Sequence, residues 1–556
     1  MIKFVAAGFA SALSFVLLGA SPGLADRTDP PSGAPTLMLA SQVGPSRGGP
    51  SGLPRGYMPL HAREYALAKA AANAKAGLGN GRPPKPKPGG GGGPTIFNLP
   101  NVAPSFDGTF QSGVTPPDTT GAIGPDRYIE TVNTTYAIYG RAGSLINTGS
   151  LSALTGISGG LFGYSLSDPQ MMWDAKTARF YYSAVYYDLF FSSTGLAVGW
   201  SKTATPTSAS DFCQYAIDFG GELPDYPKLG DSSDFLLYGY NLYGNFASTY
   251  DGSGFVTVNK PPSGSTCAST TTFSVHTSGV LHNADGSLAA TPVPANLVDD
   301  SNGAGYVVAN ADLTDLAAHP SGADFASVYA VTTSGTDANG VPIPSLTGPT
   351  NVSVPTYAMP ANAPEQGSPY LLDTLDGRFE AAVAATDPGH GGQIALWTAH
   401  AVFGGAGTEE RWYEIDPAAG FLLQSGSATS SSLFVWNGAI SPDRANTGTS
   451  ASFGDSMAMS VSTSSASTFP AIRIVWKKGA NNQSPLTSLV QATGTNVDSS
   501  CSSTSPCRWG DYSGASPDPA PTGTTGTVWL ANQYNVASGT SSDTDWRTRI
   551  FGVKPN

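Results

Sequence analysis

The stretch SDPQMMWDAKTARFYYSAV, residues 167–185, carries the pattern that decides the fold. It opens on a polar pair, Asp168 and Pro169, passes through a turn at 174–178, and ends in a strand dense in aromatic residues. Short runs of this kind, bounded by Gly, Pro, Asp and Ser, are typical of β-strands. Seven such units occur, and they begin at residues 116, 167, 224, 295, 371, 436 and 508.

The spacing of these units, about 50 to 80 residues, is enough for a four-stranded blade with variable loops. Radial repetition of blades protects strand edges from aggregation. The sequence therefore predicts an all-β fold, a single β-propeller of seven blades over residues 101–556. Six blades is the alternative count, because the units at 295 and 436 are weak, and an array of β-sandwiches is the alternative architecture.

The N-terminal hundred residues have a different texture. Residues 1–25 have the features of a signal peptide, with Lys3 ahead of the apolar run FVAAGFASALSFVLLGA and small residues before Asp26. Residues 26–100 are expected to be a disordered Pro/Gly-rich linker with a short Ala-rich helix at 61–78. A secreted or periplasmic protein is predicted, with no transmembrane segment after signal cleavage.

The four cysteines suit an oxidising compartment. Cys501 and Cys507 enclose SSTSP, a loop that a disulfide can close, which leaves Cys213 and Cys267 as the second pair. Four cysteines allow three pairings, and loop length alone favours this one.

The charge distribution limits the partners. The chain has a net charge of −13, yet residues 26–100 carry nine Lys/Arg and three Asp/Glu, so the acidic excess lies in the predicted propeller. An acidic body argues against nucleic acid as a partner. It is compatible with metal ions and with neutral or cationic substrates.

Several motifs carry a resemblance: DPQMMWDAKTARFYYS, PDYPKLG, DGRFEAAV, LWTAH, RWYEI and CRWGDYSGASPDP. Together they resemble a family of secreted bacterial β-propellers, loosely sialidase-like and mostly uncharacterised, over most of residues 105–556. The resemblance implies a propeller fold, an extracytoplasmic location and a connection to glycan chemistry. The Asp-box of sialidases, S-x-D-x-G-x-T-W, is absent.

Polar residues recur where each unit begins, and propeller ligands bind where the inner strands open at one face. The residues expected to converge there are Asp118, Asp168, Asp225, Lys228, Asp373, Asp376, Trp436 and Asp511. A ring of aspartates can supply the two carboxyls that glycoside hydrolysis needs, or it can hold Ca2+. The alternative for each aspartate is a structural role, capping a turn.

Four residues are predicted to be catalytic: Asp511, Tyr512, Asp168 and Asp118. Substrate binding is predicted for Arg508, Lys228, Arg378, Trp436 and Trp412. An arginine suits bidentate binding of a carboxylate, and a tryptophan can stack on a sugar ring. The alternatives are an internal Arg508–Asp511 pair and a Trp412 buried in an outer strand next to Glu414.

Two functions fit these features. The first is an exported glycan-directed propeller, a polysaccharide hydrolase or lyase with its site at the channel mouth. The second is a non-catalytic module that binds an extracellular polymer or surface partner. The sequence leaves open whether the chain is an enzyme. A monomer is expected, and the sequence identifies no certain cofactor, with Ca2+ as the candidate ion.

Overall fold

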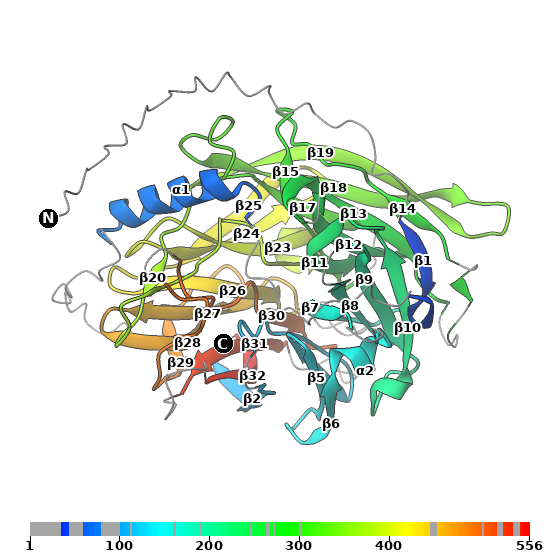
Figure 1. Cartoon of the computed structure of the whole chain (residues 1–556), viewed down its shortest axis with the longest axis horizontal. Helices are drawn as coiled ribbons and strands as arrows, with labels where there is room; N and C mark the ends of the chain where they lie inside the picture. The colour runs from blue at the N-terminus through cyan, green and yellow to red at the C-terminus, as the bar shows by residue number, and fades with distance from the viewer. Residues whose placement is uncertain are drawn as a thin grey trace, which may run out of the picture.

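The structure is a computed structural model. It describes residues 35–43, 59–78, 100–111, 114–158, 163–188, 191–244, 247–262, 267, 269–270, 273–299, 303–444, 453–502, 505–519, 526–536 and 545–555. Seven sheets of four or five strands and one two-stranded sheet make up the fold. The predicted seven-bladed β-propeller is confirmed, with one large sheet to each blade (Figure 1). The predicted signal peptide and most of the predicted linker lie outside the described residues.

In each of the first four blades, the strands run in order from the inner strand outward. Blade 1 contains β3 (Thr120–Ile123), β4 (Arg127–Val132), β5 (Thr135–Gly140) and β6 (Leu145–Ser150). Blade 2 contains β7 (Ser165–Asp174), β8 (Arg179–Tyr187), β9 (Thr194–Ser201) and β10 (Phe212–Asp218). Blade 3 contains β11 (Leu223–Asp231), β12 (Phe235–Gly244), β13 (Thr249–Asn259) and β14 (Val275–Thr277). Blade 4 contains β15 (Ala289–Pro294), β17 (Gly305–Ala311), β18 (Ala323–Thr336) and β19 (Pro342–Tyr357).

The remaining blades follow the same plan. Blade 5 contains β22 (Ala381–Asp387), β23 (Gln393–Val402), β24 (Glu409–Asp416) and β25 (Phe421–Ala428), with β16 (Asn296–Leu297) added parallel to β22. Blade 6 contains β26 (Phe434–Pro442), β27 (Met457–Ser465), β28 (Thr468–Lys477) and β29 (Thr487–Val490). Blade 7 contains β30 (Gly514–Pro517), β31 (Val528–Asn535), β32 (Trp546–Lys554) and β2 (Asn101–Asp107). Strands β20 (Ala363–Pro364) and β21 (Leu371–Leu372) pair separately.

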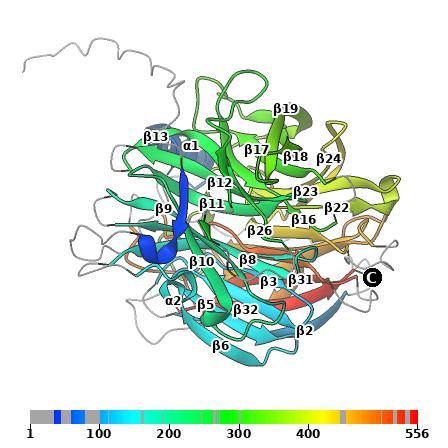
Figure 2. The same ribbon diagram turned by 90° about the vertical axis from the view of Figure 1, so that its right-hand side faces the viewer.

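The ring closes between the two ends of the propeller sequence. Strand β2, the first of the propeller, pairs antiparallel with β32, the last, and the two lie side by side in Figures 1 and 2. The inner strands then contact one another around the axis, with β30 beside β3. Aromatic and aliphatic side chains seal this closing interface: Ile123, Tyr128, Ala137, Tyr139, Trp529, Ala531 and Ile550.

The inner strands share a backbone irregularity. Strands β7, β11, β15 and β26 each bulge where a non-glycine residue has a positive φ, at Asp168 (52°), Tyr226 (54°), Thr291 (48°) and Asn437 (55°). Proline or glycine follows in every case. A bulge re-aims side chains and interrupts pairing, so it sets which groups face the axis. The fourth unit was predicted to open at residue 295, but its inner strand is AATPVP (289–294), where Thr291 replaces the expected aspartate.

Two short segments ahead of residue 101 also pack on the propeller. Strand β1 (Thr36–Leu39) extends blade 2 by pairing with β10 and leads into the 3-10 turn η1 (Ala40–Gln42). The Ala-rich segment forms helix α1 (Ala62–Lys75), which buries Ala68, Lys69 and Ala72. Short helices α2 (Leu151–Thr155), η3 (Ala209–Asp211) and η5 (Pro388–His390) complete the secondary structure. No helix in the described part of the chain is long and apolar enough to cross a membrane.

Both predicted disulfides are present, Cys213–Cys267 and Cys501–Cys507. Cys213 lies in β10 of blade 2, and Cys267 follows β13 of blade 3, so the first disulfide links neighbouring blades. The second lies next to the propeller axis.

Replacing Ile550 tests the closing interface. Ile550 is fully buried between blades 7 and 1, so Ile550→Ala should lower the free energy of unfolding by about 2–5 kcal/mol. The neighbouring Arg549 makes a half-exposed ion pair with Asp107, so Arg549→Ala should cost no more than about 1 kcal/mol. Urea denaturation of both variants measures the difference; equal effects would contradict a closing role for this interface.

Candidate functional site

Polar residues from five blades converge at the axis. Asp118 and Asp511 are joined by a hydrogen bond from the Asp511 amide to Asp118 Oδ1, at 2.7 Å, across the closing interface. Asp168 and Asp225 stand close enough that Asp225 raises the pKa of Asp168. The structure thus brings together residues that the sequence analysis expected to converge, and the cations Arg508, Arg378 and Lys228 lie among them.

Arg508 is the central cation. Its guanidinium contacts Asp511 Oδ1 at 2.5 Å and Asp373 Oδ2 at 3.4 Å, and it is 8% exposed. The pKa of Arg508 is raised because Asp511, Asp373 and Asp118 outweigh the effect of burial. The pairing of Arg508 with Asp511 is the internal pair that the sequence analysis held open.

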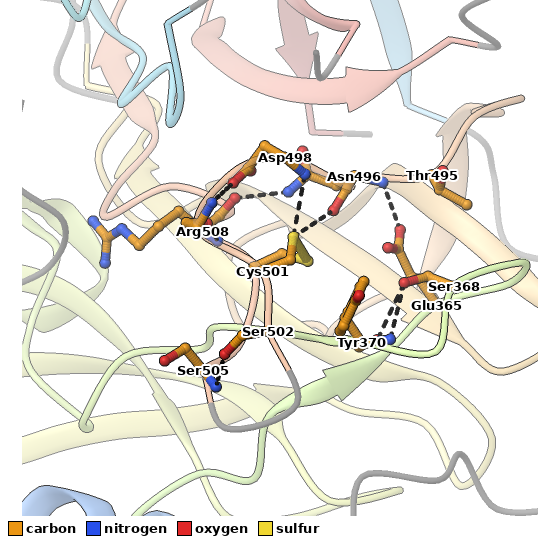
Figure 3. Close-up of a disulfide and its surroundings, with 12 residues drawn as sticks. Glu365, Ser368, Tyr370, Thr495, Asn496, Asp498, Cys501, Ser502, Ser505 and Arg508 are labelled. Atoms are coloured by element: carbon orange, nitrogen blue, oxygen red, sulfur yellow. Dashed lines mark hydrogen bonds between the residues drawn. A yellow bond between two sulfur atoms is a disulfide. The ribbon is translucent and has the colours of Figure 1, made fainter. Parts of the chain in front are cut away.

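The neighbouring disulfide loop positions Arg508. The amide of Cys507 donates to the Leu371 carbonyl and the amide of Asp373 donates to the Cys507 carbonyl, so two distant segments pair beside the axis. The Arg508 carbonyl accepts from Asn496 Nδ2 at 2.7 Å, and its amide donates to Ser500 Oγ at 2.9 Å. Figure 3 shows the Arg508 side chain extending away from the disulfide. The loop therefore fixes the backbone of Arg508 beside that of its partner Asp373.

Asp118 links blade 1 to blade 2 through Asn133 and to blade 7 through the Asp511 amide. The Asn133 side-chain amide donates to Asp118 Oδ2 at 2.6 Å, and its oxygen accepts from the Asp168 amide at 2.9 Å. Burial raises the pKa of Asp118, and Asp511 and Asp168 raise it further. Asp118 is 1% exposed, so the carboxyl that joins these three blades is buried inside the propeller.

Lys228 lies between two tyrosine rings. Its Nζ is 3.7 Å from the ring centroid of Tyr512 and 4.0 Å from that of Tyr226, which is within cation–π distance. Both hydroxyls donate to backbone carbonyls: Tyr512 to Pro169 at 3.2 Å and Tyr226 to Asp511 at 2.8 Å. Burial lowers the pKa of Lys228 to about 7, although Glu380 and Asp168 oppose that shift.

Arg378 forms the second ion pair. Its guanidinium donates to both carboxylate oxygens of Asp376, at 2.8 and 2.7 Å, and lies 4.6 Å from the Tyr226 ring centroid. This bidentate pair is almost fully buried. Arg378 lowers the pKa of Asp225, against the larger effect of burial, which raises it.

Asp168 and Asp225 differ from the other axial acids in exposure. Both are partly exposed, whereas Asp118 and Asp511 are buried. Desolvation is the main cause that raises the pKa of each, and Asp511 raises both further. Asp168 and Asp225 are therefore the two axial acids, from neighbouring blades, that are not fully buried as residues, and desolvation nevertheless raises the pKa of both carboxyls above the usual range.

Sequence analysis missed two buried glutamates. Glu380 stands immediately before β22, and burial raises its pKa well above the usual value, with a further contribution from Glu410. Glu380 and Lys228 line a cavity of about 50 Å3 enclosed by the inner strands. The available signal was position, since Glu380 follows the motif DGRF directly.

The two tryptophans predicted to bind substrate are buried in this structure. Trp412 is 2% exposed, stacks on Trp397 and donates to Gln483 Oε1 at 2.5 Å. Trp436 is 1% exposed and packs edge to face on Trp509. A ring enclosed on both faces cannot stack on a sugar.

Helix α1 reaches the same cluster from outside the blades. Tyr65 donates to Asp373 Oδ1 at 3.0 Å, and the Lys69 ammonium donates to the Pro360 carbonyl at 3.1 Å and to Thr374 Oγ1 at 2.8 Å. In Figure 1, α1 is drawn near β25, and its Lys75 Nζ lies 4.1 Å from the ring centroid of Phe403, which follows β23. A segment expected to belong to the linker thus supplies a hydroxyl to the axial ion network.

The axial acids do not form a compact ion cage in the described part of the chain. Among the described residues, no three of the axial acids place one carboxylate oxygen each within 4.8 Å of the other two. Ca2+ binds six to eight oxygens at 2.3–2.6 Å, which is a much tighter set. The geometry of the described residues therefore gives no support to the expected Ca2+ at the axis.

Comparison with known proteins finds similarity in fold only. No family model matches the chain, and no curated protein matches it. A solved Dos1 propeller is 11% identical, with a TM-score of 0.36 over 82% of this chain and 96% of that one. A GH93 α-L-arabinofuranosidase of Fusarium graminearum is 13% identical (TM-score 0.33, 60% and 84%), and Trypanosoma rangeli sialidase is 10% identical (TM-score 0.33, 69% and 55%).

Replacing Arg508 tests the axial ion network. Arg508→Met leaves two buried carboxylates without their cation, so the free energy of unfolding should fall by about 3–5 kcal/mol at pH 8. The loss should be smaller at pH 5, because burial raises the pKa of the neighbouring Asp118 and a protonated Asp118 reduces the negative charge that Arg508 balances.

Arg547→Met is the matched control. Arg547 pairs with Asp545 two residues away in the same blade, but its side chain is 30% exposed, so its loss should cost about 1 kcal/mol or less. Urea unfolding at both pH values measures each variant. If both variants lose the same free energy of unfolding, the axial ion pairs do not stabilise the fold more than an exposed pair does.

Proposed function

We propose that this chain is an exported glycan-directed propeller that hydrolyses glycosidic bonds at its channel mouth, with Asp168 and Asp225 as the catalytic carboxyls. One observation carries the proposal: these two acids, at the bulges of neighbouring blades, are the partly exposed members of an otherwise buried charged cluster. Glycoside hydrolysis uses two carboxyl groups, one as acid and one as nucleophile or base. Secretion and a monomeric state belong to the same proposal.

The surroundings divide the two roles. Asp168 has its pKa raised by burial and by two carboxylates, Asp225 and Asp511, so it holds the proton that protonates the leaving oxygen. Arg378 opposes the rise at Asp225, so Asp225 is the group that ionises first and acts as nucleophile or base. Environments that push two carboxyl pKa values apart are the general device for such a pair.

The other predicted catalytic residues support this pair from behind. Asp118 and Asp511 are buried: the Asp511 amide donates to Asp118, and Arg508 donates to the Asp511 carboxylate. The Tyr512 hydroxyl donates to a backbone carbonyl. In this proposal Asp118, Asp511 and Tyr512 position the catalytic acids, while Arg508, Arg378 and Lys228 balance their charge.

A second candidate is non-catalytic binding of a polymer at the same mouth. Helix α1 favours it, because Tyr65 of that helix covers part of the cluster by bonding to Asp373. Binding of a polysaccharide without release of reducing ends or unsaturated products would favour this candidate over hydrolysis.

A polysaccharide panel tests the proposal. The purified mature protein is incubated with neutral and uronic-acid polysaccharides, and new reducing ends and unsaturated products are measured separately. We expect reducing ends without unsaturation, because two carboxyls serve hydrolysis. Asp168→Asn and Asp225→Asn should each lower kcat by about 100-fold or more.

Asp337→Asn is the control variant, since Asp337 lies in an exposed turn between β18 and β19. It should keep full activity. Unsaturated products would indicate a lyase, and activity retained by both Asp168→Asn and Asp225→Asn would remove these acids from catalysis.

The pH profile provides a second test. Asp225 must lose its proton to act, and burial raises its pKa to about 7, so kcat/KM should fall as the pH drops below about 7 and not near the ordinary carboxyl pKa of about 4. Measuring kcat/KM from pH 4 to 9 on the best substrate of the panel shows where this acidic limb of the pH profile lies. A limb near pH 4 would mean that a solvated carboxyl is the base.

A further inference from the structure

A second cluster of ionisable groups lies at the far end of β22. Asp387 is the last residue of β22, His390 ends the 3-10 turn η5, and Glu414 lies in β24 of the same blade. One ligand atom from each of the three lies within 4.8 Å of the others. Strand β22 separates this cluster from Glu380 by seven residues, or about 20 Å, so it is distinct from the axial site.

The non-ligating atoms of both carboxyls are held in place. Asp387 Oδ1 accepts from the Gly389 amide at 2.6 Å, and Glu414 Oε2 accepts from Gln424 Nε2. This leaves Asp387 Oδ2 against His390 Nδ1, and Glu414 Oε1 3.8 Å from the same nitrogen. Outer hydrogen bonds that orient each ligand in this way are a feature of metal sites.

Glu414 Oε1 is an unsatisfied acceptor. The Glu414 side chain is fully buried, yet among the described residues Oε1 accepts no hydrogen bond. A buried carboxylate oxygen without a partner is costly. Because this oxygen faces the imidazole and the Asp387 carboxyl, a cation placed between the three would satisfy it.

The neighbouring charges do not supply that cation. Lys477 at the end of β28 is near enough to influence the pKa of Glu414, but its ammonium donates to the Gly479 carbonyl. Asp455 adds another carboxylate nearby, and its Cβ lies 3.3 Å from the position that a Cβ on Gly389 would take. Among the described residues, three carboxyl groups therefore lie near one imidazole and one more distant ammonium, that of Lys477.

We propose that Asp387, His390 and Glu414 form a binding site for a divalent transition-metal ion of the Zn2+ class. One imidazole nitrogen and two carboxylate oxygens are ligands that Zn2+ accepts, whereas Ca2+ prefers oxygen alone. The two carboxyls are buried, but the His390 side chain is 38% exposed, so the ion can enter from solvent and keep a water as its fourth ligand.

Zn2+ binding to the chelator-treated full chain tests the proposal. Isothermal titration calorimetry with ZnCl2 should give one site per chain, and Zn2+ should raise the melting temperature in a concentration-dependent way. Replacing Zn2+ with Co2+ should give visible absorption bands of a low-coordinate site. These readouts do not depend on any glycan activity.

Three variants identify the ligands. His390→Ala and Glu414→Gln should each weaken Zn2+ binding by about 10-fold or more and abolish the Co2+ bands. His276→Ala, in β14 of blade 3, is the matched control and should bind as the wild type does. His390 is partly exposed, so its replacement keeps the test valid even if Glu414→Gln fails to fold.

Two results would overturn the site. The first is no Zn2+ binding by the wild-type chain at micromolar concentrations. The second is equal affinity in wild type and His390→Ala, which would place the ion elsewhere.

Discussion

Carboxyl groups from several blades share the axis of this propeller only because arginine and lysine are buried among them. Arg508 binds Asp511 and Asp373, and Arg378 binds Asp376, with all five groups nearly inaccessible to water. Isolated buried carboxylates would be far too costly, so these pairs are a condition for bringing the inner strands together. The ion network therefore fixes which blades meet at the axis and which acids are left facing solvent.

The backbone contributes a second constraint. Non-glycine residues take up left-handed conformations at Asp118, Asp168, Tyr226, Thr291, Leu375 and Asn437, with φ between 47° and 56°. Each such residue costs on the order of 1 kcal/mol, and such strain persists only where the surroundings over-determine it. Here the surroundings are the neighbouring inner strands and the hydrogen bonds of Asn133 and Asp511. The bulges bring polar side chains to the axis in a fold whose strands would otherwise present apolar ones.

Sequence reasoning succeeded where the signal was local. The alternation of aromatic strands with polar turns predicted seven blades, and the short spacing of Cys501 and Cys507 predicted their disulfide. It failed where the outcome depended on packing. The inner strand of blade 4 was misplaced because Thr291 stands at its bulge, where the other units led us to expect an aspartate. The burial of Trp412 was missed because its neighbours, Trp397 and Gln483, come from other strands and loops. Glu380 was overlooked because nothing in FEAAV distinguishes a channel-lining glutamate from a solvated one.

The sequence by itself determined the blades, because strand and turn preferences act between residues that are close along the chain. It also marked the aspartates, arginines and lysine that meet at the axis. Only the tertiary structure decided their neighbours: Asp118 and Asp511 are separated by 393 residues, and Tyr65 reaches Asp373 from a helix outside the blades. The tertiary structure also decided which acids stay accessible, since burial and pairing depend on how seven blades close around one axis.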